Sequence, residues 1–176
     1  MKNNLMVAAV VAAFGMSAGA SAQYTQKTVD FGAKGVSLRG GLAIPIDDKL
    51  KDEDSSLFNV GLDWQFGRPL FKGGDSYFSI DYFAKNLRGK RGTVIPILVN
   101  QKFYGPGEDG TRSYFFFGAG VSTIDFGSAN SVFGIRGGAG KELGESIFFE
   151  VTAHLSDKAD NGYRGNLFAF NVGYRF

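Results

Sequence analysis

The ionisable side chains of this 176-residue chain that could do chemistry follow one alternating pattern. The chain has one His and no Cys, which excludes thiol nucleophiles, disulfides and thiolate metal sites. Its formal net charge of +2 does not suggest a nucleic-acid partner. We expect no cofactor. The charged or ionisable residues that occupy the polar positions of alternating segments are Arg39, Asp63, Asp81, Lys102, Arg136, Glu150, His154 and Arg175.

The same alternation identifies the elements that must position these side chains. In residues 58–66 (FNVGLDWQF), large apolar residues alternate with Asn, Gly, Asp and Gln. Side chains of a strand point to opposite faces in turn, so one face is apolar and the other polar. Strands of about ten residues with this pattern are typical of transmembrane β-barrels. We predict strands at residues 35–44, 58–66, 77–85, 93–104, 114–124, 132–141, 147–155 and 166–176.

The predicted fold is therefore all-β: an eight-stranded, antiparallel, up-and-down transmembrane β-barrel. An even number of strands places both chain termini on the periplasmic side. Connections at 45–57, 86–92, 125–131 and 156–165 then face outside, and turns at 67–76, 105–113 and 142–146 face the periplasm. No helical periodicity is visible after residue 22. The acidic segment 47–54 (DDKLKDED) is interpreted as a solvated loop.

The two ends of the chain predict where the barrel resides. Residues 1–22 combine Lys2, a short apolar run and the small residues Ala20 and Ala22, which is typical of a cleaved signal peptide. Residues 23–176 then form the barrel domain, located in the bacterial outer membrane. The final strand resembles the C-terminal signature of outer-membrane proteins, which implies recognition by the barrel-assembly machinery. Its expected lipid-facing residues are Phe168, Phe170, Val172, Tyr174 and Phe176.

The polar face must fill the interior of the barrel. Eight strands enclose a space just wide enough for side chains, so buried charges there need partners. We predict a lumenal network of ion pairs and hydrogen bonds, with Glu150 as a possible partner of His154. A narrow polar conduit is the alternative.

A basic cluster lies at the second outside connection. Guanidinium and ammonium groups bind phosphate well, so we predict contact with lipopolysaccharide phosphates, with plain surface charge as the alternative. The cluster consists of Lys85, Arg88, Lys90 and Arg91.

Two stretches carry a family resemblance. Residues 95–104 (IPILVNQKFY), a Gly-rich turn and residues 114–121 (YFFFGAGV) resemble the opacity-protein and OmpW-like family of small outer-membrane β-barrels. The ending VGYRF at 172–176 is also similar. These are fold motifs, and the resemblance implies architecture and location rather than a reaction.

A second resemblance concerns His154 and Ser156. The His-x-Ser segment is similar to the catalytic segment of PagL-type lipid A deacylases, which implies His154 as base and Ser156 as nucleophile. The chain departs from that pattern, because Phe168 lies where those enzymes have an acid and Asp157 replaces an Asn. Both residues also share the inward parity, away from lipid.

The function predicted from sequence is non-enzymatic. We expect a monomeric barrel with a structural or surface-interaction role, whose partners are outer-membrane lipid and lipopolysaccharide. A narrow pore for small or apolar solutes is the first alternative, and the deacylase is the second.

Overall fold

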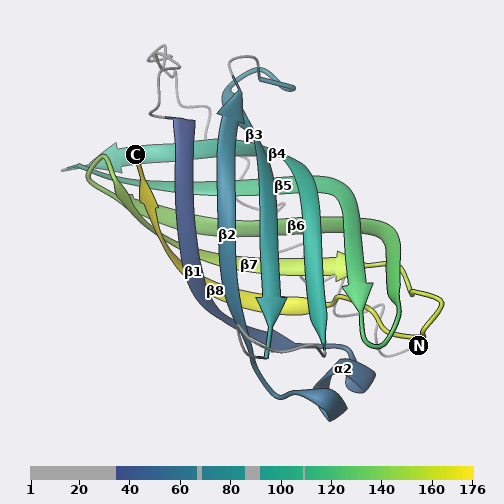
Figure 1. Cartoon of the computed structure of the whole chain (residues 1–176). Helices are drawn as coiled ribbons and strands as arrows, with labels where there is room; N and C mark the ends of the chain where they lie inside the picture. Colours follow the sequence, from purple (N-terminus) through teal and green to yellow (C-terminus); the bar gives the residue numbers. More distant parts are fainter. Residues whose placement is uncertain (1–34, 67–68, 86–91, 109) are drawn as a thin grey trace.

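The chain forms a closed barrel of eight antiparallel strands joined in sequence order (Figure 1). This computed structural model describes residues 35–66, 69–85, 92–108 and 110–176. The predicted fold class is confirmed. The predicted signal peptide lies outside the described residues, as do Arg88, Lys90 and Arg91. The strands are β1 (Val36–Pro45), β2 (Leu57–Phe66), β3 (Gly74–Ala84), β4 (Thr93–Glu108), β5 (Thr111–Asp125), β6 (Ala129–Leu143), β7 (Ile147–Ser156) and β8 (Leu167–Arg175).

Burial alternates along the strands as a barrel requires. In β2 every second residue is buried from Leu57 to Gln65, and the residues between them are exposed. The outward side chains are large and apolar: Phe58 is 53% exposed and Trp64 is 62% exposed. A soluble lipid-binding barrel would have the opposite pattern, with its apolar side chains inside.

The barrel closes where β1 meets β8. Their register runs from Ser37 opposite Arg175 to Pro45 opposite Leu167. The amide of Phe176 donates to the carbonyl of Val36 over 3.0 Å, just beyond this ladder. We call this end of the barrel, where β1 begins and β8 ends, the terminal end. The opposite end carries residues 46–56 and 157–166 and is called the loop end (Figure 1).

The strands extend into several of the predicted connections, and the predicted turn at 105–113 is shortened the most. Residues 105–113 (GPGEDGTRS) have the composition of a loop, yet β4 and β5 continue through most of them, and Glu108 pairs with Thr111. The register shifts between Tyr104 and Gly107, so a β-bulge takes up the irregular residues. Gly110, with φ of 76°, supplies the left-handed turn conformation. The prediction failed because backbone pairing does not require the side-chain alternation.

The acidic loop contains a short helix that the sequence analysis did not predict. Helix α2 (Asp48–Glu53) begins after Asp47, whose carboxylate accepts from the amide of Leu50 over 3.3 Å. Six residues are too few to show a helical period, which explains the wrong prediction. Leu50 is fully buried, so the helix is held by packing as well as by its cap. Within the described segments, no helix has the length and apolar character needed to cross a membrane.

Candidate functional site in the barrel lumen

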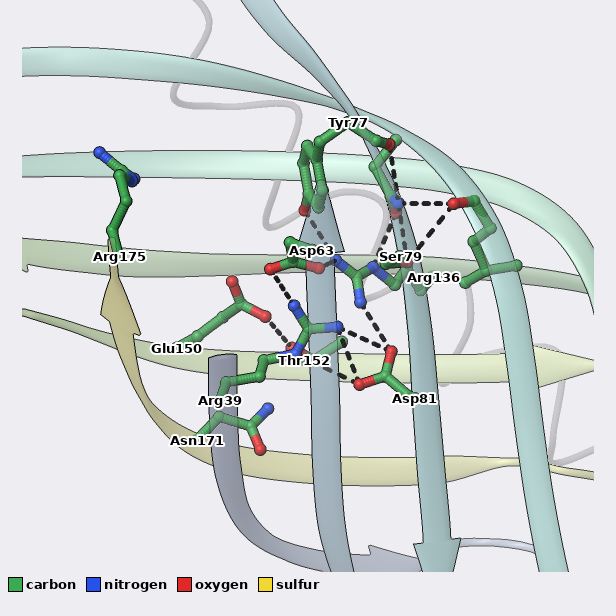
Figure 2. Close-up of polar contacts among 12 residues, drawn as sticks. Arg39, Asp63, Tyr77, Ser79, Asp81, Arg136, Glu150, Thr152, Asn171 and Arg175 are labelled. Atoms are coloured by element: carbon green, nitrogen blue, oxygen red, sulfur yellow. Dashed lines mark hydrogen bonds and ion pairs between the residues drawn. The ribbon is translucent and has the colours of Figure 1, made fainter. Parts of the chain in front are cut away.

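The middle of the lumen holds a group of ion pairs that we call the central network: Arg39, Asp63, Tyr77, Asp81, Asn100 and Arg136. The Arg39 guanidinium lies between two carboxylates (Figure 2). It donates to both oxygens of Asp81 over 2.8 Å and to Asp63. All three side chains are at least nine-tenths buried, so each charge depends on its partners.

Arg136, from strand β6, also contacts the Asp81 carboxylate. Its Nη1 donates to Asp81 over 2.9 Å and its Nη2 donates to the Tyr77 hydroxyl over 2.7 Å. Its Nε donates to the Asn100 side-chain oxygen over 2.7 Å. Asp81 therefore serves two arginines, one from β1 and one from β6. The four charged side chains balance each other and bridge the lumen (Figure 2).

The loop end of the lumen is filled by apolar side chains, which we call the apolar plug. Inward positions of the strands supply most of it, while α2 and the β7–β8 connection supply the rest. Phe126 and Val132 pack against it, and the Phe126 ring stacks on Tyr163 at 4.5 Å between centroids. The plug consists of Ala43, Leu50, Leu57, Phe83, Val94, Ile124, Ala159, Tyr163, Leu167 and Ala169.

The terminal end of the lumen contains an aromatic layer: Tyr77, Tyr114, Phe116 and Phe148. The Lys102 ammonium lies 4.2 Å from the centre of the Tyr114 ring and 5.5 Å from that of Phe148. These contacts place a buried cation on aromatic faces. Inward glycines make room for the rings, since a Cβ on Gly173 would lie 2.0 Å from Phe148.

Two carboxylates, Glu150 and Glu142, complete the terminal end. Glu150 accepts from the Tyr114 hydroxyl over 3.1 Å and from the Thr152 hydroxyl over 2.9 Å. Glu142 accepts from Arg175 over 2.5 Å and from Arg112 over 2.8 Å. Buried side chains of the three layers therefore lie in the middle of the lumen and toward both of its ends.

His154 lies between the central network and the apolar plug. Its ring packs edge-on against Phe83, 4.9 Å between centroids, and its Nδ1 has no hydrogen-bond partner. The suggested pairing with Glu150 is wrong, because that carboxylate is engaged by Tyr114 and Thr152.

The Ser156 hydroxyl belongs to the loop end. It accepts from the amide of Gly165 over 2.7 Å and donates to the carbonyl of Asp157 over 3.0 Å. These bonds hold the β7–β8 connection in place. Among the described residues, no group of three or more His, Asp or Glu side chains is arranged to hold a metal ion.

The remaining predicted residues that the structure describes lie on the surface. Lys85 forms an ion pair of 2.5 Å with Asp54, which ties the start of the β3–β4 connection to the acidic segment after α2. Phe170, Val172, Tyr174 and Phe176 are half or more exposed on the outside of the barrel. Phe168 has the same parity and is partly covered.

Sequence reasoning missed the apolar plug and the aromatic layer. Their residues lie on the inward parity, which the alternating pattern assigns to polar residues. Phe83 follows Asp81 by two positions, and Phe116 precedes Gly118 by two. The inward-facing positions of each strand, followed to the strand ends, change from polar residues to apolar or aromatic ones along the barrel axis.

Several solved structures are similar to this chain. Neisserial surface protein A superposes with a TM-score of 0.50 at 11% identity, over 80% of this chain and 96% of that one. The N-terminal β-barrel domain of Pseudomonas aeruginosa OprF gives 0.47 at 13%, over 81% and 98%. Ail, the attachment invasion locus protein of Yersinia pestis, gives 0.46 at 16%, over 81% and 99%. No family model and no curated protein matches the sequence.

Proposed function

We propose that this chain is a non-enzymatic, monomeric, integral protein of the bacterial outer membrane with a structural or surface-interaction role. The observation that carries the proposal is the contrast between outside and inside. The exterior presents exposed rings such as Phe58 and Trp64, while the lumen is filled by charged, aromatic and apolar layers. A closed barrel satisfies its backbone internally, which suits it to hydrocarbon, and a filled lumen suits anchoring better than transport.

We orient the barrel in the outer membrane with its terminal end toward the periplasm and its loop end toward the outside of the cell. The loop end is held together by contacts between distant segments. Lys49 donates to the carbonyl of Asn161 over 2.7 Å, and the Tyr163 hydroxyl donates to Glu53 over 2.8 Å. Such an ordered acidic surface suits contact with a partner at the cell surface. The basic cluster that begins at Lys85 would contact lipopolysaccharide phosphates.

The resemblance to opacity and OmpW-like barrels extends the proposal to biogenesis. The signal peptide would direct export, and the final strand ending at Phe176 would be read by the barrel-assembly machinery. Replacing Phe176 with Asp should reduce the amount of heat-modifiable barrel in outer-membrane fractions. The matched control is Lys158→Asp, an exposed change in the β7–β8 connection. Equal assembly of both variants would contradict the role of the last residue.

The decisive experiment for the role measures conductance and lipid A together. The folded protein is placed in a planar bilayer, and lipid A from producing cells is compared by mass spectrometry with that of His154→Ala cells. The proposal predicts no single-channel steps and identical lipid A. Conductance steps that change in Glu150→Ala would indicate a pore. Loss of an acyl chain only with the wild type would assign catalysis to His154 and Ser156.

A further inference from the structure

An isolated cation lies on the lipid-facing surface of the barrel. Among outward strand positions whose side chains the structure describes, the charged residues are Lys141 and Asp125. Asp125 ends β5 at the loop end, whereas Lys141 lies two residues from the terminal end of β6. Lys141 is exposed and, within the described residues, forms no ion pair. An unpaired ammonium at this depth needs either water or an anion.

Lys141 lines an apolar groove on the outside of the barrel. The groove has a volume of about 690 Å³ and crosses β6, β7, β8 and β1, which are neighbours in the sheet (Figure 1). Phe149, Phe170 and Leu42 border it, each about half exposed. Gly40 and Ala139 lie on the same face and leave the space between these larger side chains open.

The register of the strands gives the groove a direction. Lys141 is opposite Phe149, Phe149 is opposite Val172, and Val172 is opposite Gly40. Lys141 is close to the terminal end of β6, but Gly40 is in the middle of β1. The groove therefore rises from the rim of the barrel toward the middle of the membrane. A lipid has the same arrangement, with a headgroup at the rim and a chain that reaches inward.

We propose that this groove binds an anionic glycerophospholipid of the periplasmic leaflet. The Lys141 ammonium contacts the lipid phosphate, and one acyl chain lies along Phe149 and Phe170 over Gly40. The assignment rests on the proposed membrane location, with the terminal end toward the periplasm. A single cation beside an otherwise apolar groove complements one phosphate and one chain. A second copy of the barrel would leave the ammonium facing an apolar surface.

The test is native mass spectrometry of the folded chain in detergent, titrated with phosphatidylglycerol and, separately, with phosphatidylcholine of the same acyl chains. We expect one phosphatidylglycerol to be retained more tightly than phosphatidylcholine. Lys141→Gln should weaken phosphatidylglycerol binding about fivefold, the effect of one cation near an anionic lipid surface, and should remove the preference. Lys141→Arg should keep it. Unchanged binding in Lys141→Gln would overturn the proposal.

Filling the groove tests the site of the acyl chain. Gly40→Leu should reduce binding of both lipids, and a Cβ at Gly40 meets nothing closer than 3.7 Å, so the change fits the fold. Gly137→Leu is the matched control, since its Cβ also has 3.6 Å of clearance and Gly137 does not line the groove. Ala139→Leu repeats the test if Gly40→Leu does not fold. Equal lipid binding in Gly40→Leu and Gly137→Leu would contradict the groove. A lipid-independent dimer lost only in Gly40→Leu would instead assign the groove to a second copy.

Heat-modifiable gel mobility separates this proposal from that of membrane insertion. If a variant is folded and inserted in vesicles but has lost its lipid preference, the loss is assigned to the groove and not to a failure of membrane insertion. If the wild type fails to insert into vesicles, the proposed location itself is wrong.

Discussion

The central network and the apolar plug fill neighbouring parts of one lumen by opposite means. In the network, Asp81 holds two arginines, and every charge depends on a partner from another strand. In the plug, Leu50, Leu57 and Leu167 are fully buried in one apolar cluster. Apolar contacts of this kind require no particular bond geometry. Losing one partner of a buried ion pair leaves an uncompensated charge, whereas a deletion in an apolar cluster loses the transfer free energy of the removed atoms and leaves a cavity. The central network thus requires one arrangement of its charged side chains, whereas the apolar plug stabilises the barrel through the burial and packing of apolar side chains.

Removing the shared carboxylate should have the largest effect. Asp81→Ala leaves two buried guanidinium groups with fewer anions, and we expect a loss of about 3–5 kcal/mol of unfolding free energy. Urea titration of the barrel in vesicles, followed by fluorescence of the single tryptophan, Trp64, measures it. The control is Asp125→Ala, an exposed carboxylate at the rim, which should change stability by less than about 0.5 kcal/mol. Equal effects of the two variants would remove the distinction between network and rim.

A deletion in the plug should cost somewhat less. Leu57→Ala removes a side chain that is 1% exposed, and we expect a loss of about 3 kcal/mol. Because the central network still occupies the lumen, the variant should remain silent in planar bilayers. Channel steps in Leu57→Ala would show that the plug alone blocks the barrel. The control is Leu62→Ala, an outward residue at 46% exposure, which should leave the lumen unchanged.

The boundary between the two regions offers a change that should stabilise. His154 packs against Phe83 with an unpartnered Nδ1, and a buried unsatisfied nitrogen is unfavourable. His154→Leu should therefore raise the unfolding free energy by about 1 kcal/mol, measured in the same urea titration. A clear loss would mean that the imidazole makes a necessary polar contact. His154→Gln serves as the polar control and should gain nothing.

The smallest effect should come from the hydrogen bond that Tyr163, a residue of the apolar plug, makes to Glu53. The hydrogen bond to Glu53 raises the pKa of the Tyr163 hydroxyl. A raised pKa in the folded state means that this bond contributes fully below the unfolded pKa, near 10, and is lost as pH rises through the folded pKa. Wild-type stability should fall more steeply than that of Tyr163→Phe above about pH 10. Parallel pH profiles would show that the bond does not contribute.

Much of this architecture is predictable from alternation. The eight strands and the inward parity of Asp63 and Arg136 follow from the period of two, because each face of a strand meets one environment. The extended β4–β5 hairpin does not follow, since backbone pairing across Tyr104 and Gly107 is independent of side-chain polarity. Helix α2 is too short to have a period and depends on a cap and one buried leucine.

The arrangement of the lumenal charges was less predictable than their parity. Parity places Arg39 and Asp81 inside, but which cation meets which carboxylate depends on the stagger between strands and on side-chain length. Gly61 illustrates this dependence. A Cβ there would lie 2.4 Å from an Asp81 oxygen and 2.7 Å from the Arg39 Nε, so the pair exists only because that position is empty.

The ladder between β1 and β8 has a consequence for biogenesis. Its paired residues, such as Ser37 and Arg175, come from opposite ends of the described chain. The last hydrogen bonds of the barrel therefore join the most distant parts of the sequence, and contacts of this kind slow folding. Until they form, β1 and β8 both present open edges that can pair with other chains. Until β8 pairs with β1, aggregation through these edges must be prevented. Once the barrel is closed, neither strand has an unpaired edge at which unfolding can begin.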